Sequence, residues 1–209
     1  VDRDQMINTI LEGRGKLGHD HPIWQGYQWY KDLGTRERNV EKAKELLSEA
    51  GYSDLEINIY HEADDEFSAG TVLNLRQMAR PAGIRVKPQG VNSDVYYSKY
   101  WLQANATCTT WAHRENIIDL LNLQYKSDGP WNEGHYKNSE LDELIDKADS
   151  EANPEKRQEH FTGIQEILRN NGPAVIPFFR GLYYASRTGV EDVWGVRIGK
   201  VELRYARPA

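Results

Sequence analysis

Apolar side chains recur every three to four residues in several segments, which is the spacing of one face of an α-helix. In residues 40–50 this spacing groups Leu46 and Leu47 with two alanines, and Gly51 follows as a stop signal. Ser139 is expected to cap one helix, and Asn153 precedes a proline that opens the longest one. We predict helices over residues 4–12, 40–50, 67–79, 139–148 and 154–171, with two more at 94–103 and 116–125.

Strand patterns lie between these helices. Leu55, Ile57 and Ile59 alternate with polar residues, as do Ile84 and Val86. Helices and strands that follow one another in this way indicate an α/β fold with a largely parallel or mixed sheet. The predicted strands cover residues 55–59, 84–87, 106–112, 174–179 and 201–205. Residues 13–35 form a long aromatic loop, which is typical of a functional or partner-facing segment.

Composition removes several classes of function. The 209 residues include 32 acidic and 26 basic side chains, so the net charge of −6 argues against nucleic-acid binding. The single cysteine, Cys108, excludes an internal disulfide framework. No apolar run approaches the roughly 20 residues that a membrane-spanning helix needs.

Several short motifs, taken in order, resemble the C-terminal lobe of the extracytoplasmic solute-binding proteins of family 5, the peptide- and nickel-binding receptors of ABC importers. The most specific is the helix Lys-Ala-Lys-Glu-Leu-Leu-Ser-Glu-Ala-Gly-Tyr at residues 42–52. The others are Asp-Arg-Asp-Gln-Met-Ile at 2–7, Ala-Gly-Ile-Arg-Val at 82–86, Gly-Pro-Trp-Asn at 129–132, Lys-Asn-Ser-Glu-Leu-Asp at 137–142 and Ile-Pro-Phe-Phe at 176–179.

The resemblance implies a lobe of the type II periplasmic-binding-protein kind, in which a mixed sheet is flanked by helices. Members of the family have two lobes and are much longer than this chain. We therefore expect a fragment whose ligand-binding lobe is residues 1–178, with residues 179–209 as a tail that returns toward the hinge and the missing N-terminal lobe. The start at Val1, without a methionine or a signal peptide, fits that expectation.

The function implied is that of the substrate-binding component of an ABC importer, located in the periplasm or otherwise outside the cytoplasm. Its partners would be a small solute, the other lobe and the ABC permease, with no nucleic acid. We expect no enzymatic activity, no cofactor and no metal. The solute would be a short peptide, or a peptide-like or opine-like acid, held in a cleft between the lobes.

The segment after the strand predicted at 106–112 carries the main candidate ligand contacts. In peptide-binding members this strand ends in a Trp, followed three residues later by an Asp that pairs with the ligand's amine. Here Trp111 is followed by Arg114, which reverses the charge and favours a carboxylate on the ligand. His113 is a further candidate. Alternatively, Arg114 pairs with an acidic residue of its own lobe and Trp111 belongs to the core.

A turn-rich loop at residues 128–136 supplies two more candidates, because the resemblance places it at the border of the cleft. Trp131 offers an aromatic surface, and the Asn132 amide both donates and accepts hydrogen bonds. Alternatively, Trp131 anchors the loop and Asn132 completes a turn. The ligand-binding residues predicted are thus Trp111, His113, Arg114, Trp131 and Asn132.

Two other classes of function stay open at this point. One is a hydrolase or transferase that uses Glu and His side chains in an aromatic-lined pocket, although no catalytic motif of a known type is present. The other is a protein-interaction domain, which would gather Trp24, Trp29 and Trp131 on one open face. His19 and His21 lie close in sequence, but no third metal ligand accompanies them.

Overall fold

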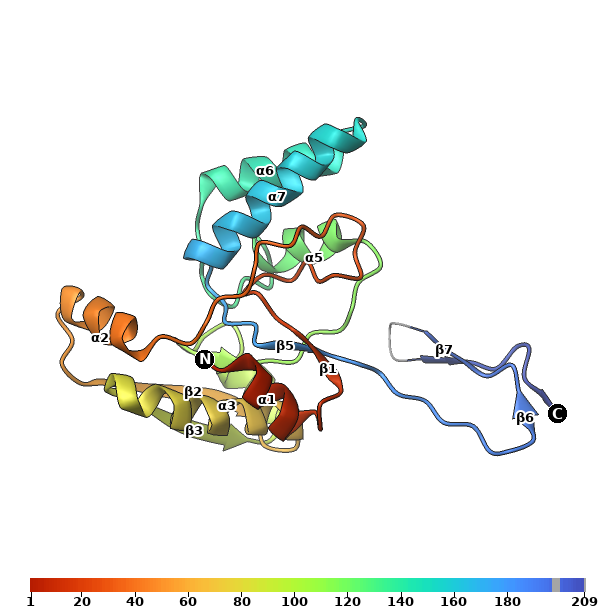
Figure 1. The fold of residues 1–209 in the computed structure, drawn as a ribbon, viewed down its shortest axis with the longest axis horizontal. Helices are drawn as coiled ribbons and strands as arrows, with labels where there is room; N and C mark the ends of the chain where they lie inside the picture. The colour runs from red at the N-terminus through yellow and green to blue at the C-terminus, as the bar shows by residue number, and fades with distance from the viewer. Residues whose placement is uncertain (197–199, 209) are drawn as a thin grey trace.

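A three-stranded parallel sheet forms the lower layer of the computed structural model, which describes residues 1–196 and 200–208 (Figure 1). The strand order is β3–β2–β4, and β2 pairs in register with β3 along its whole length. Helix α3 packs on this sheet, and α1 packs on α3. The elements are α1 (Arg3–Ile10), β2 (Leu55–Glu62), α3 (Glu66–Ala79), the 3₁₀ turn η1 (Arg80–Ala82), β3 (Ile84–Val91) and β4 (Thr107–Cys108).

Three helices form the upper layer, and a short ribbon lies between the layers (Figure 1). The helices are α5 (Ile117–Gln124), α6 (Ser139–Ser150) and α7 (Pro154–Asn171). The ribbon pairs β1 (Gly15–Leu17) with β5 (Phe178–Arg180) in antiparallel fashion. The α/β class predicted from the alternating patterns is confirmed, and the described sheet that carries the site is parallel.

The helix termini show how the sequence signals work. Pro154 opens α7 as predicted, and Asn153 before it is the cap, since its side chain accepts hydrogen bonds from two backbone amides at the start of the helix. The prediction for α6 is wrong by one residue. Asn138 has extended backbone and accepts a hydrogen bond from the Leu141 amide at 3.0 Å, so Asn138 is the cap and Ser139 is already helical.

Other elements differ from their predictions for local reasons. The strand predicted at 106–112 is only two residues long, since its pairing with β2 ends at Cys108; beyond it the hydroxyls of Thr109 and Thr110 donate to the carboxylates of Glu133 and Asp65. The helix predicted at 94–103 is a short α4 (Ser93–Val95) followed by a π-helical turn η2 (Tyr96–Tyr100), and Leu102 has a left-handed φ of 61°. Strand β1 lies inside the segment expected to be loop.

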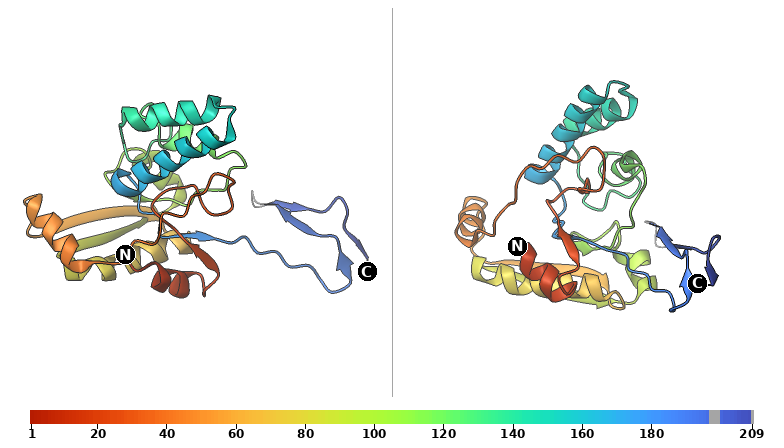
Figure 2. Two further views of the ribbon diagram at one scale, coloured as in Figure 1. Left: turned by 45° about the horizontal axis from the view of Figure 1, so that its top comes forward. Right: turned by 45° about the vertical axis from the view of Figure 1, so that its right-hand side comes forward.

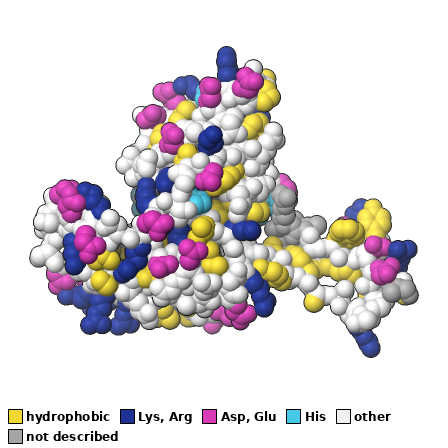
Figure 3. All heavy atoms as spheres, viewed as in Figure 1, with side chains coloured by type: hydrophobic (Ala, Val, Ile, Leu, Met, Phe, Trp, Pro, Cys, Tyr) yellow, Lys and Arg dark blue, Asp and Glu magenta, His cyan; other side chains and the backbone are white. Residues whose placement is uncertain are grey.

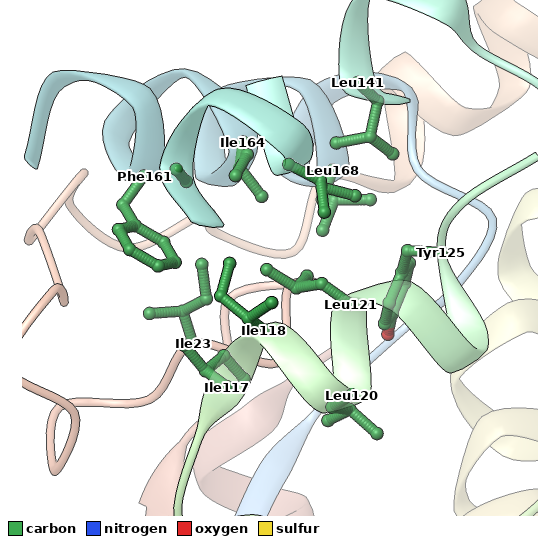
Figure 4. Packing of buried hydrophobic residues seen from close by; sticks show 12 residues of the cluster. Ile23, Ile117, Ile118, Leu120, Leu121, Tyr125, Leu141, Phe161, Ile164 and Leu168 are labelled. Atoms are coloured by element: carbon green, nitrogen blue, oxygen red, sulfur yellow. The ribbon is translucent and has the colours of Figure 1, made fainter. Parts of the chain in front are cut away.

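Two hydrophobic cores stabilise the two layers separately. In the upper core Ile23, from the aromatic loop, packs among the buried side chains of α5, α6 and α7 (Figure 4). The lower core is small and centres on Ile59, Val72 and Val86. The helix predicted at residues 40–50 is present as α2 (Val40–Glu49), but its apolar face is not covered: α2 has no buried residue, and Leu46 is 52% exposed.

The C-terminal tail extends away from both layers (Figure 2). It contains two short antiparallel pairs, β6 (Val190–Glu191) with β9 (Arg207–Pro208), and β7 (Trp194–Val196) with β8 (Lys200–Glu202). Apolar side chains lie along the segment that leads to it (Figure 3). Large exposed apolar residues of the tail include Leu182, Tyr183, Trp194, Leu203 and Tyr205. The division at residue 178 stays a prediction.

A buried ion pair connects the two layers. The Arg3 guanidinium, on α1 of the lower layer, lies 2.6 Å from the Asp20 carboxylate in the aromatic loop, and both side chains are almost fully buried. The other Asp20 oxygen accepts a hydrogen bond from the Ile176 amide at 3.0 Å, just before β5. Arg3 also donates to the Arg36 carbonyl at 3.0 Å. One carboxylate therefore holds three separate segments together.

We expect Asp20→Asn to destabilise the fold by about 3 kcal/mol, because the amide leaves the Arg3 charge buried without its counter-ion. Urea unfolding followed by circular dichroism measures the loss. Glu12→Gln is a matched control: Glu12 also has a left-handed backbone, and its ion pair with Arg14 is exposed. That change should cost less than about 1 kcal/mol. Equal losses in the two variants would contradict the role given to Asp20.

Candidate functional site

A cluster of aromatic and polar side chains lies where β2 and β4 end, at the carboxyl edge of the parallel sheet. This edge is where open α/β sheets bind ligands, because loops of different strands meet there. We call it the strand-end cluster. Its members come from the segment after η2, from β4 and the loop after it, and from the loop after α5: Trp101, Thr107, Thr109, Trp111, Trp131 and Glu133.

The carboxylate of Glu133 is the centre of this cluster. One of its oxygens accepts hydrogen bonds from the indole N–H groups of Trp101 and Trp111, each at 2.9 Å. The other accepts from the hydroxyls of Thr109 at 2.9 Å and Thr107 at 3.3 Å. Within the described part of the chain, Glu133 forms no ion pair. Neutral donors alone therefore solvate its charge.

Two further carboxylates line the same edge. Glu62, the last residue of β2, accepts a hydrogen bond from the Tyr97 hydroxyl at 2.9 Å, and burial together with this carboxylate raises the pKa of Tyr97 to about 12. Asp65 caps α3 and accepts from the Thr110 hydroxyl at 2.7 Å. Partial burial disfavours its charge, but the hydrogen bonds outweigh burial and lower the pKa of Asp65.

The predicted residues Trp111 and Trp131 both belong to the cluster, with ring centroids 5.8 Å apart. Asn132 is buried beside them, but its amide is occupied inside its own loop. It donates to the carbonyls of Lys126 and Tyr136 and accepts from the Tyr136 amide at 3.1 Å. The geometry thus gives Asn132 a loop-organising role, and ligand contact by its side chain stays a prediction.

His113 lies on a second set of aromatic rings, and one of these rings also contacts the backbone of Arg114. The imidazole of His113 stacks on Tyr27, with centroids 5.0 Å apart, and meets Trp24 edge-on at 6.2 Å. The Tyr27 hydroxyl donates to the Arg114 carbonyl at 2.5 Å, which fixes the backbone of that residue. The aromatic loop therefore contributes directly to the position of the predicted ligand-binding segment.

The guanidinium of Arg114 has no acidic partner among the residues that the structure describes. Its Nε atom is buried and makes no hydrogen bond, although the side chain as a whole is only half-buried. Among the described residues, therefore, Arg114 does not form the ion pair within its own lobe that was the alternative to ligand binding. A guanidinium in this state is suited to a carboxylate or phosphate supplied from outside.

Sequence reasoning missed Glu133 and Trp101. Both are ordinary residue types in a turn-rich or short helical segment, and no spacing rule connects positions 101, 111 and 133. The adjacency of Glu133 to the predicted pair Trp131 and Asn132 was the available signal. It carried no information about which groups the carboxylate would meet.

The three tryptophans expected on one open face for an interaction domain lie apart and half-buried. Trp29 stacks on Phe161 of α7 at 5.4 Å, Trp24 contacts Phe179 of β5 at 6.2 Å, and Trp131 packs in the strand-end cluster. These contacts fasten loops to the body of the protein, so the described structure does not support that alternative.

A nucleophilic or metal-dependent site finds no support among the described residues. Burial raises the pKa of the Cys108 thiol to about 12, so the reactive thiolate is scarce at neutral pH. No group of three His, Cys, Asp or Glu side chains there could hold a metal ion. None of the described helices has the length and apolarity needed to cross a membrane.

His21 is buried, and neither of its ring nitrogens has a hydrogen-bond partner within the described residues. It lies near His19 and Tyr30, with ring centroids 6.1 and 6.4 Å away. Burial, with smaller contributions from His19 and Arg169, lowers the pKa of His21 to about 4. Protonation of this ring therefore opposes folding.

Comparison with known proteins places this geometry in context. The family model of bacterial extracellular solute-binding proteins, family 5 Middle, matches residues 1–134. A nickel-binding protein NikA of Staphylococcus aureus is 27% identical over 179 residues, which cover 83% of this chain and 36% of that protein. The chain spans a third to two-fifths of the length of the curated relatives it matches.

Solved structures share the fold. The periplasmic binding protein DppA from Helicobacter pylori, in complex with the peptide STSA, superimposes with a TM-score of 0.76 at 21% identity, covering 86% of this chain and 36% of that one. The binding protein AgaA from A. tumefacien R10, in complex with agropinic acid, gives 0.74 at 23% identity, covering 86% and 38%. These likenesses confirm the predicted lobe of the type II periplasmic-binding-protein kind.

The burial of His21 predicts a stability that falls as the pH falls. Its pKa is about 4 in the folded chain and about 6.5 when unfolded, so the unfolded state binds the extra proton between these values. Folding should lose about 2 kcal/mol of stability from pH 7 to pH 5 through this group alone. Urea unfolding at the two pH values measures the change.

The variant His21→Phe should remove most of that pH dependence, since phenylalanine fills the same buried space without titrating. His160→Gln, on α7, is the control and should keep the dependence of the unchanged protein. An unaltered pH dependence in His21→Phe would show that other groups cause it.

Proposed function

Because this chain belongs to the bacterial extracellular solute-binding proteins of family 5, we propose that it is one ligand-binding lobe of the substrate-binding component of an ABC importer, acting outside the cytoplasm. In this proposal residues 1–178 form the lobe, and residues 179–209 lead back to a second lobe. A solute bridges the two lobes, and closure about the hinge creates the shape that the permease recognises. The role is binding, without catalysis and without a cofactor.

The observation that carries the proposal is the state of Arg114 beside the strand-end cluster. A guanidinium with a buried, unpartnered Nε is costly unless an anion meets it. It follows a parallel strand at the sheet edge where ligands bind in folds of this class. A carboxylate would satisfy two of its donors at once.

A ligand with a carboxylate is therefore the class we favour: a short peptide, or a peptide-like or opine-like acid. The peptide bound to DppA and the agropinic acid bound to AgaA belong to these classes. A bare metal ion ranks lower as the solute, although the name of NikA gives nickel for that protein, because the described residues offer no group of three His, Cys, Asp or Glu side chains to hold one. Trp111 and Trp131 would contact the rest of the solute, and His113 would border it.

Binding should need both lobes. We expect the 209-residue chain alone to bind tri-alanine at least about 100-fold more weakly than the longer receptor that contains it, because one lobe buries only part of the solute. Isothermal titration of the two proteins measures the ratio. Micromolar affinity of the chain alone would contradict the two-lobe proposal, and no binding of tri-alanine by the receptor would exclude short peptides as its ligands.

The role of Arg114 is tested with paired ligands, tri-alanine and its C-terminal amide. In the receptor, Arg114→Ala should weaken binding of the free acid by about 10- to 100-fold, which is the contribution of a charge-assisted hydrogen bond. The affinity for the amide should stay unchanged. Arg85→Ala is a control, since that arginine forms exposed ion pairs with Asp54 and Glu56. An equal effect on acid and amide, or no effect, would remove Arg114 from the site.

A further inference from the structure

Glu133 accepts hydrogen bonds at all the positions that a carboxylate offers. An ionised carboxylate has about four acceptor sites, and the four donors of Trp101, Trp111, Thr107 and Thr109 account for them. The Tyr96 hydroxyl lies 2.5 Å from the Thr109 hydroxyl and extends this network. The carboxylate is therefore enclosed by groups of its own chain.

An indole ring has a single N–H, so a hydrogen bond to that group sets the direction in which the ring points. Trp101 follows η2 and Trp111 follows β4, and both rings point their N–H at the same Glu133 oxygen. Trp131, two residues before Glu133, packs against both rings, with centroids 6.1 and 5.8 Å away. One carboxylate thus orients two half-buried indoles from different segments, and Trp131 packs against both of them.

We propose that Glu133 is a positioning residue: through its hydrogen bonds it sets the orientation of the aromatic wall formed by Trp101, Trp111 and Trp131. The wall offers apolar surface to an uncharged part of the solute, while Arg114 takes the carboxylate. The contribution to ligand binding rests on the proposed function above; the orientation of the rings does not.

The competing role for Glu133 is electrostatic, as an anion that attracts a cationic group of the ligand. Glu133→Gln separates the two roles. A glutamine carbonyl can accept from both indoles, and its amide can donate to the threonine hydroxyls, which are acceptors as well as donors. The bond between Tyr96 and Thr109 can reverse to allow this. Glu133→Ala removes every acceptor and leaves two indole N–H groups unpaired.

The first measurement uses the 209-residue chain without a ligand. Indole N–H signals in a ¹⁵N–¹H spectrum are assigned with Trp101→Phe and Trp111→Phe. In Glu133→Ala the signals of both tryptophans should move and exchange faster with solvent, whereas Glu133→Gln should keep their protection. Glu140→Ala, on the outer side of α6, is the control. Unchanged indole signals in Glu133→Ala would overturn the positioning role, whatever the receptor binds.

The second measurement is the affinity of the receptor for tri-alanine. Glu133→Ala should weaken it about tenfold or more, and Glu133→Gln should restore it to within about threefold of the unchanged protein. Equal losses in the two variants would assign Glu133 an electrostatic role instead. Moved indole signals with unchanged affinity would show that the wall does not contact the solute. A receptor that binds no tri-alanine tells against the proposed function, while the indole spectrum still decides the positioning role.

Discussion

The buried pair between Arg3 and Asp20 is the interaction on which the arrangement of the two layers depends. The two described cores share no buried residue, and the lower one is small. Asp20 binds α1 through Arg3 and the approach to β5 through the Ile176 amide. A buried carboxylate without its cation costs far more free energy than the buried pair. The segments must therefore adopt the relative placement that brings Arg3 to Asp20. The main effect of the pair is thus to select one arrangement of the two layers, more than to add net stability to the fold.

That placement also sets the position of the candidate site. The aromatic loop carries Asp20 and, three residues later, inserts Ile23 into the upper core (Figure 4). The same loop then presents Tyr27 to His113 and to the Arg114 carbonyl. A segment from the N-terminal part of the chain therefore supports the loop that follows β4, which carries both Trp111 of the strand-end cluster and Arg114.

The predicted site residues show how far local signals reach. Trp111 and Arg114 could be proposed as ligand contacts from local signals. Trp111 stands at the end of a predicted strand, and Arg114 replaces the Asp that the family pattern has at that position. Asn132 shows where such local signals fail. From its residue type the amide could bind a ligand, but in the fold it already makes three hydrogen bonds to nearby backbone groups. Glu133 had no distinguishing signal, because its importance comes from two indoles that are 32 and 22 residues away.

The sequence by itself determined the α/β class, the principal helices and the family resemblance, since these depend on periodicity, caps and short motifs that each segment carries alone. The tertiary structure decided which apolar faces are buried: α2 has the same amphipathic pattern as α6, but only α6 finds a partner layer. It also decided that Glu133 joins Trp101 to Trp111 and that Arg114 has no counter-ion within residues 1–196 and 200–208. These properties depend on contacts between distant segments, and a residue's own sequence neighbourhood contains no record of them.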